Sequence, residues 1–221
     1  MIMDLHVHTD LSDDGGASAE DYLKAITVFR EVHEFDGIVF TEHRRIDQHL
    51  DYRKLSEKYD ILVLKGVELD TNLGHLLVYG VDDYLLKHYD LSSRNIKAKE
   101  LIREVYYEGG IAIPAHPFRE SFFGKRLEEE GALFEGLAAI EGLNGQNTQV
   151  QNQRSRELAH KFGFKSTGAS DAHFVNRKWF LTCATQFDSR IENMEQFIKQ
   201  LYMGNYRPIE LNHIHTSLIP G

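Results

Sequence analysis

Histidine and acidic residues recur in this chain at the ends of short apolar runs. Imidazole and carboxylate groups are the usual protein ligands of divalent transition metals. The residues with this placement are His6, His8, Asp13, His43, Glu68, His75, His116, Asp171 and His173. The two members of the pair at 6 and 8, like those at 171 and 173, are two positions apart, so on a strand they face the same side and could share one ion. The recurrence predicts a multinuclear metallohydrolase.

The position of Asp13 is open to other interpretations. It lies in residues 12–16, a run of Ser, Asp and Gly that is typical of a solvated turn. Asp10 and Asp14 are rival carboxylates in the same segment. We therefore expect one carboxylate of this turn to reach the metal site, with Asp13 as the first choice.

Two of the histidines differ in how their surroundings constrain them. His75 precedes an apolar run, where a histidine is often a core residue, and His49 or His33 could replace it as a ligand. His116 precedes Pro117, which favours an extended conformation and hinders a helix. The second pattern predicts a histidine at the end of a strand.

The elements that must position these residues alternate along the chain. Strand-like runs cover residues 2–7, 37–40, 61–64, 75–79, 111–113, 137–143, 165–169 and 179–185. Helical patterns, two of them opening with capping boxes at 18–21 and 189–192, cover 18–32, 52–59, 93–108, 148–162 and 189–203. This alternation predicts an α/β protein with a parallel sheet, open or closed into a barrel, whose site lies at the carboxyl ends of the strands.

Length and composition bound the class of protein. The 221 residues predict one domain over 1–221, with an irregular tail from roughly 204 to 221. The net charge of −9, from 25 basic and 34 acidic side chains, disfavours a nonspecific nucleic-acid or membrane-surface binder. A single cysteine, Cys183, rules out an intrachain disulfide and favours a reduced compartment. With no signal-peptide pattern and no long apolar run, the expected location is the cytoplasm.

The motifs as a set resemble a known family. They are His6-x-His8 with Ser12-Asp13, Thr41-Glu42-His43, Gly66-Val67-Glu68, Gly74-His75-Leu76, Ala115-His116-Pro117 and Ser170-Asp171-Ala172-His173. In this order they resemble the PHP family, the polymerase and histidinol phosphatase group of metal-dependent phosphoesterases. Residues 109–117 and 140–144 are also similar to that family's pattern. One position departs from it, because Glu42 stands where the family usually has Asp.

The resemblance implies a distorted seven-stranded (β/α) barrel that binds two or three divalent ions of zinc, manganese or iron. Carried over by motif, the first ion would take His6, His8, Glu68 and Asp171, the second would share Glu68 and add His75 and His116, and the third would take Asp13, His43 and His173. Catalytic roles would fall to His6, His8, Glu68, Asp171 and His173.

The implied activity is hydrolysis of a phosphomonoester or a short nucleotide phosphodiester by a metal-activated hydroxide. Phosphate recognition should add a guanidinium, with Arg119 as first choice, then Arg44 or Arg45, and Arg177 after the last motif. The expected partner is a small phosphorylated substrate, a nucleotide among the candidates, with no membrane and no long nucleic acid; the oligomeric state is open. The alternatives are an amidohydrolase-like C–N metallohydrolase and a non-catalytic PHP-like partner module.

Overall fold

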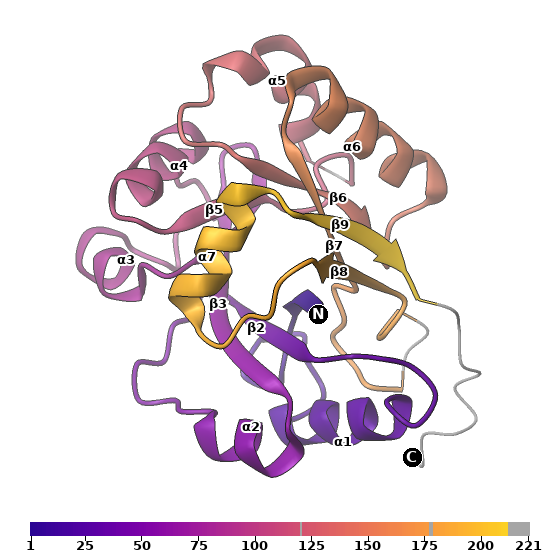
Figure 1. Cartoon of the computed structure of the whole chain (residues 1–221). Helices are drawn as coiled ribbons and strands as arrows, with labels where there is room; N and C mark the ends of the chain where they lie inside the picture. Colours follow the sequence, from indigo (N-terminus) through magenta and orange to yellow (C-terminus); the bar gives the residue numbers. More distant parts are fainter. Residues whose placement is uncertain (120, 177–178, 212–221) are drawn as a thin grey trace.

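The computed structural model describes residues 1–119, 121–176 and 179–211 (Figure 1). Its strands are β1 (Ile2–Val7), β2 (Gly37–His43), β3 (Leu62–Thr71), β4 (Gly74–Tyr79), β5 (Ile111–Pro114), β6 (Ala139–Asn144), β7 (Lys165–Ala169), β8 (Cys183–Phe187) and β9 (Tyr206–Glu210). In the described part of the chain they form a seven-stranded sheet in the order β5-β4-β3-β2-β1-β8-β9 and a two-stranded sheet of β6 and β7.

The α/β class is confirmed, but the sheet is open and mixed rather than a closed parallel barrel. β1, β2 and β3 run parallel, as do β6 and β7. β3 and β4 form an antiparallel hairpin, and β5, β8 and β9 also pair antiparallel with their neighbours. Only residues 72 and 73 separate β3 from β4, and a parallel crossover needs a dozen residues or more. The short connection therefore enforces the hairpin.

The two sheets meet beside β1. The backbone N–H of His8 donates to the carbonyl of Ala172 at 2.8 Å, and that of Asp171 donates to the carbonyl of His6 at 2.9 Å. The buried carboxylate of Asp4 accepts from the backbone of Ser170 at 3.0 Å. These bonds carry the segment after β7 to the end of β1, so that residues far apart in sequence share one edge.

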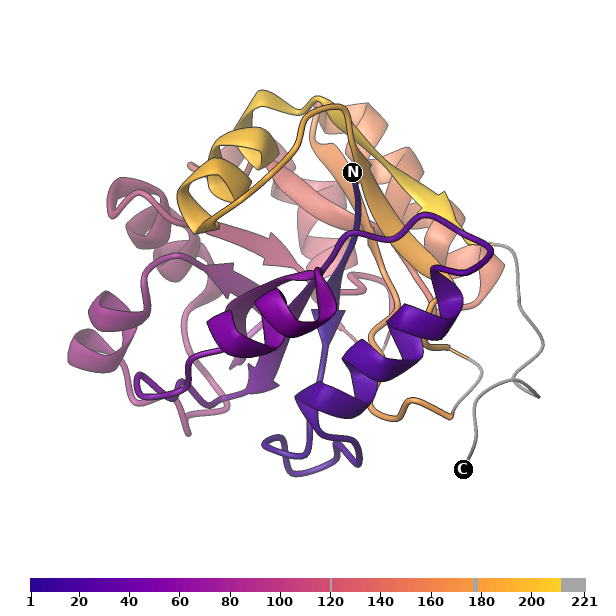
Figure 2. The same cartoon turned by 60° about the horizontal axis from the view of Figure 1, so that its bottom comes forward.

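The helices lie around the outside of the curled strands (Figures 1 and 2). They are α1 (Ala19–Phe29), α2 (Arg53–Tyr59), α3 (Asp82–His88), α4 (Ala98–Tyr107), α5 (Phe123–Glu130), α6 (Gln149–Phe162) and α7 (Met194–Met203), with a 3₁₀ turn η1 (Gly131–Leu133). The expected capping box is present at Ser18 with Asp21, and Thr148 forms another with Gln151. The box expected at residues 189–192 is wrong, because Asn193 caps α7 instead.

The apolar faces of these elements form the core. On α1, Tyr22, Leu23 and Ile26 are fully buried against β1 and β2. Phe197 and Leu201 of α7 pack with side chains of the central strands. Burying one such side chain contributes roughly 1.5–3 kcal/mol. The helical stripes therefore hold the strands whose ends carry the candidate ligands.

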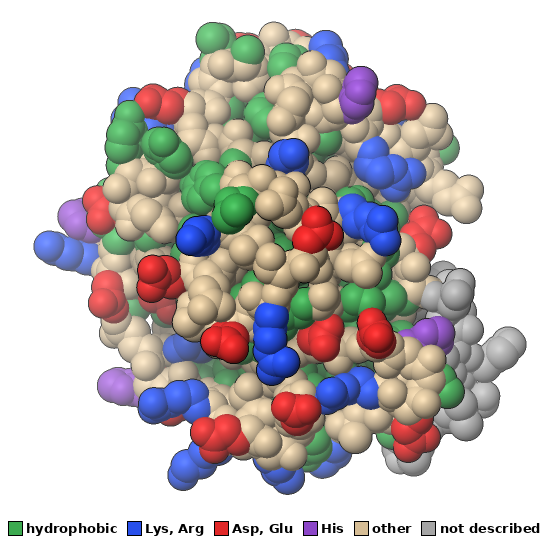
Figure 3. Space-filling model, in the orientation of Figure 1, with side chains coloured by type: hydrophobic (Ala, Val, Ile, Leu, Met, Phe, Trp, Pro, Cys, Tyr) green, Lys and Arg blue, Asp and Glu red, His purple; other side chains and the backbone are tan. Residues whose placement is uncertain are grey.

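Two expectations at the end of the chain need correction. The strand expected at 179–185 begins at Cys183, and Tyr206–Glu210, expected to be irregular, pairs with it as β9. Residues 212–221 lie outside the described residues. Among the helices that the structure describes, none is long and apolar enough to cross a bilayer. Acidic and basic side chains are interspersed on the face seen in Figure 3.

Candidate metal centre

The strand ends bring all the predicted ligands except Asp13 into one cluster. His6 lies on β1 and His8 just beyond it, His43 ends β2, Glu68 is on β3, His75 is on β4, His116 follows β5, and Asp171 and His173 follow β7. In the described part of the chain, three overlapping groups of these side chains have ligand atoms within 4.8 Å of one another. The cluster is therefore compact enough to hold more than one ion.

The most buried group gathers two carboxylates around the facing nitrogens of His6 and His8. The Nε2 atoms of His6 and His8 lie 3.0 Å apart, and each is 3.2 Å from Oε2 of Glu68. The same two nitrogens lie 3.4 and 3.5 Å from Oδ1 of Asp171. Ligand atoms about 2.1 Å from one tetrahedral ion lie roughly 3.4 Å from each other. The donor set therefore fits a divalent ion such as zinc.

Glu68 connects this group to a second one. Its Oε1 lies 2.8 Å from Nδ1 of His75 and 3.3 Å from Nε2 of His116. Its Oε2 lies 3.2 Å from Nδ1 of His43. Because the two oxygens face different imidazoles, this carboxylate is placed to bridge two ions.

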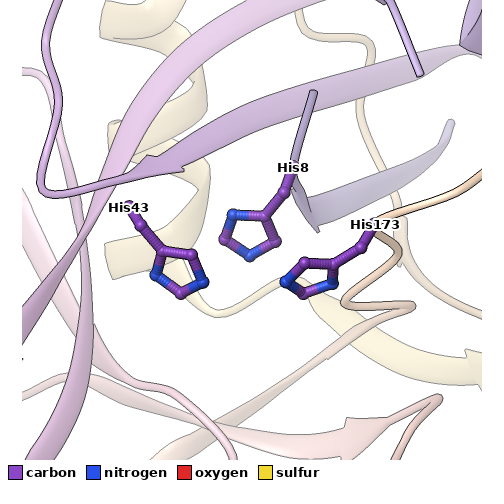
Figure 4. Close-up of side chains that lie close together, drawn as sticks. All are labelled: His8, His43 and His173. Atoms are coloured by element: carbon purple, nitrogen blue, oxygen red, sulfur yellow. The ribbon is translucent and has the colours of Figure 1, made fainter. Parts of the chain in front are cut away.

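The third group consists of three imidazoles that point toward one another (Figure 4). The centroid of the His8 ring lies 4.3 Å from that of His43 and 4.2 Å from that of His173, and the last two are 5.8 Å apart. Oδ2 of Asp14 lies 3.4 Å from Nε2 of His43 and 3.2 Å from Nε2 of His173. A carboxylate therefore completes this group from the turn after β1.

The structure corrects which carboxylate of that turn reaches the cluster. The side chain of Asp13 is 90% exposed and pairs with Arg44 at 3.2 Å. The backbone N–H of Gly16 donates to the carbonyl of His173 at 2.9 Å, which anchors the turn beside β7. Asp14, with 55% of its side chain exposed, is the aspartate of this turn that contacts the cluster, whereas Asp13 pairs with Arg44 outside it.

Glu42, the departure from the family pattern, faces the same turn rather than the cluster. Its carboxylate accepts from the hydroxyl of Thr9 at 2.8 Å and from that of Ser12 at 2.6 Å. The hydroxyl of Ser12 in turn accepts from the backbone N–H of His43 at 3.0 Å. The longer side chain thus ties the ligand-bearing turn to β2.

Unpaired nitrogens provide a further test of metal fit. The Nδ1 atoms of His43 and His116 are buried and have no hydrogen-bond partner among the described residues. A buried polar atom left without a partner costs about 1–3 kcal/mol. For His43, whose Nδ1 faces Glu68, an ion between the two atoms would remove that cost. The donor chemistry of the cluster therefore fits divalent metal.

Charge interactions inside the cluster set the protonation of its members. Burial disfavours charge on His6 and His8, yet Asp171 and Glu68 raise the pKa of His6 well above its usual range and that of His8 to about 9. Burial is likewise overcome for Glu68 and Asp171, whose pKa values the histidines hold well below the usual range. Burial lowers the pKa of His43 to about 4. Metal binding would therefore displace protons from His6 and His8.

The predicted phosphate-binding arginines are placed differently from one another. Arg119 donates to Oδ2 of Asp171 and, at 3.2 Å, to Oδ1 of Asn144. Its side chain is 25% exposed, so it lies at the edge of the cluster. It is therefore in reach of a molecule bound there.

Arg44 and Arg45 are less directly connected than Arg119. Arg44 pairs with Asp70 at 3.1 Å, and Asp70 lies 3.2 Å from Nε2 of His75. Arg45 donates to the carbonyl of Leu11 at 3.4 Å and is exposed. Arg177 lies outside the described residues. Of the two described arginines, Arg44 has a contact that leads to the cluster.

Two acidic residues of the site were not predicted. Asp70 is two positions after Glu68 on β3 and faces the same side of the strand, a signal that alternation alone could have supplied. Glu141 is fully buried on β6 and lies 3.0 Å from Nδ1 of His6. A charged residue inside an apolar strand was the available signal for the second.

The backbone is strained where two ligands leave their strands. His116 has φ of 28° and Asp171 has φ of 57°. Residues other than glycine rarely adopt positive φ, and such conformations are held only when the surroundings enforce them. The backbone N–H of His116 donates to Glu141 on β6, and that of Asp171 donates to the carbonyl of His6. These hydrogen bonds hold the two ligands in their strained conformations.

Comparisons with known proteins agree with this fold. Residues 149–206 match the family model described as PHP-associated. No curated protein matches the chain by sequence. The structure of PsfC from Pseudomonas syringae PB-5123 is similar with a TM-score of 0.67 at 20% identity, over 99% of this chain and 93% of that protein.

Two longer proteins share the fold as well. A two-domain Bacteroides vulgatus protein containing a predicted PHP-like metal-dependent phosphoesterase has a TM-score of 0.63 at 18% identity, over 96% of this chain and 65% of its own. The lesion-specific endonuclease PfuEndoQ from Pyrococcus furiosus has a TM-score of 0.65 at 14% identity, over 94% of this chain and 57% of its own. The matched segment and the shared fold agree with the resemblance to the PHP family that the sequence motifs carry.

Proposed function

We propose that this chain is a metal-dependent phosphoesterase that hydrolyses a phosphomonoester or a short nucleotide phosphodiester. The observation that carries the proposal is the close approach of Glu68 and Asp171 to the facing nitrogens of His6 and His8, with the second oxygen of Glu68 turned toward further imidazoles. Mixed imidazole and carboxylate donors suit Zn²⁺, Mn²⁺ or Fe²⁺. Two or three such ions, held by one domain spanning the chain, are part of this proposal.

The bound ions would lower the pKa of water and offset the charge that builds on the phosphoryl oxygens. The residues of the chain supply the remaining functions. His75, with 38% of its side chain exposed, is the most exposed histidine of the cluster, which favours approach of the substrate from that side. Arg119 at the edge would bind a phosphoryl oxygen, and a histidine of the site would protonate the leaving oxygen. The proposed catalytic residues are His6, His8, Glu68, Asp171 and His173.

The size of the substrate is the least constrained part of the proposal. The net charge of −9 and the interspersed charges of Figure 3 favour a small substrate over long nucleic acid. The likeness to a lesion-specific endonuclease favours long nucleic acid as the substrate instead. Damaged duplex DNA is therefore the second candidate substrate. The single cysteine supports the cytoplasm as the compartment.

The test is hydrolysis across a panel of phosphomonoesters, dinucleotides and a lesion-containing DNA duplex, with Mn²⁺ and with a chelator. We expect chelator-sensitive product release on at least one member. Asp171→Asn and His8→Ala should abolish it and lower the metal content of soluble protein. No release from protein that still holds metal would contradict the proposal and favour a C–N hydrolase or a partner module.

A further inference from the structure

A buried carboxylate lies behind the metal centre. Glu141 of β6 is fully buried, and its Oε1 is 3.0 Å from Nδ1 of His6. The opposite nitrogen of that ring, Nε2, faces His8, Glu68 and Asp171. Glu141 thus contacts the ring nitrogen of His6 that points away from those three side chains. It therefore contacts a ligand without being one.

This contact determines which nitrogen of His6 is free to bind. A neutral imidazole carries one N–H, and an ionised carboxylate only accepts hydrogen bonds. Glu141 therefore holds the proton on Nδ1 and leaves the lone pair of Nε2 directed at the cluster. We infer that Glu141 is a positioning residue that fixes the tautomer and ring orientation of His6 for metal binding, an inference that rests on the proposed function.

The other oxygen of the same carboxylate is fixed by two donors. The backbone N–H of His116 donates to Oε2 at 2.7 Å, and Nδ2 of Asn144 donates to it at 2.8 Å. Nδ2 of Asn144 also lies 3.3 Å from Oδ2 of Asp171. Glu141 thus joins the end of β1, the strained residue after β5 and the segment after β7. Contacts with residues of both sheets therefore restrict the rotation of the Glu141 carboxylate.

These contacts make Glu141→Gln an informative substitution. Because the two donors must keep an oxygen opposite them, the new amide nitrogen should face Nδ1 of His6. An N–H directed there favours the tautomer with the proton on Nε2, which blocks the metal-binding lone pair. Loss of such a partner weakens metal binding by about 10- to 100-fold. We expect that reduction in zinc affinity with the fold retained.

The matched control is Glu104→Gln on α4. Glu104 also accepts hydrogen bonds from neighbouring side chains, the hydroxyls of Tyr84 at 3.1 Å and of Tyr89. Neither tyrosine belongs to the metal cluster. This variant should bind zinc as the wild type does.

The measurements are zinc affinity by chelator competition and the tautomer of His6 by ¹⁵N NMR of the zinc-saturated protein. The wild type should show His6 protonated on Nδ1; protonation on Nε2 would overturn the inference even if Glu141→Gln failed to fold. Unchanged zinc affinity of folded Glu141→Gln would also overturn it. A wild type that binds no divalent metal would instead overturn the proposed function, and this inference with it.

Discussion

At the scale of single residues, the site is organised around one shared carboxylate. Oε2 of Glu68 lies 3.2 Å from nitrogens of His6, His8 and His43, whereas Oε1 faces His75. These residues could be predicted from the sequence because alternation along a strand fixes which side a residue faces. The choice between Asp13 and Asp14 could not, because it depends on how a turn is anchored to a distant segment.

The two aspartates of that turn form a matched pair for mutation. Asp14→Ala should remove one ligand beside His43 and His173 and lower both metal content and the rate of hydrolysis. The loss of metal affinity should be at least the roughly 10- to 100-fold that loss of an outer-shell partner costs. Asp13→Ala removes only an exposed pair with Arg44, worth at most about 1 kcal/mol. Measuring the metal content per chain and the hydrolysis rate of both variants distinguishes which aspartate is the ligand. Equal losses in the two would refute the assignment of Asp14.

The single cysteine gives a prediction independent of the metal. Burial raises the pKa of the Cys183 thiol to about 12. Since only the thiolate reacts readily, a thiol-specific reagent at pH 8 should modify the folded protein far more slowly than the unfolded one. The unfolded thiol loses its proton near pH 8.5, so this group should make stability fall as pH rises above about 8.5. Rapid labelling of native protein would contradict the burial of Cys183.

At the scale of elements, local patterns predicted helices better than strand directions. The capping box at Ser18 and the left-handed Gly163 after α6 follow from residues close in sequence. The direction of β4 depends on the shortness of its turn, and β9 depends on pairing with β8. The short helices α3 and α5 bury few apolar residues, which leaves little periodic signal to detect.

The start of α7 can be tested with a second matched pair. The side chain of Asn193 accepts from the backbone N–H of Gln196 at 2.9 Å, which satisfies a donor of the first helical turn. Asn193→Ala should therefore lower the free energy of unfolding by about 1 kcal/mol. Ser189→Ala, at the exposed position where the sequence pattern suggested a cap, should change it by less than about 0.5 kcal/mol. Urea denaturation of both variants measures the difference, and a larger loss for Ser189→Ala would reverse the cap assignment.

At the scale of the whole molecule, the metal centre spans the junction between the two sheets. His6, His43 and Glu68 belong to strands of the larger sheet, whereas Asp171 and His173 follow the smaller one. The family pattern could predict that these residues meet, because it carries the order of the strand ends. It could not predict that the sheet is open, since closure depends on pairing between strands far apart in sequence.

This junction predicts that metal stabilises the entire fold. An ion held by ligands from both sheets binds the folded chain and not the unfolded one, so a free concentration 100-fold above Kd should add about 2.7 kcal/mol. For a chain of this length, that corresponds to a rise in Tm of roughly 5–11 °C. Differential scanning calorimetry with zinc and with a chelator measures the shift. His8→Ala, which lacks a ligand of the buried group, should lose most of it, whereas Asp13→Ala should keep it. A Tm that is the same with zinc and with chelator would show that no ion joins the two sheets.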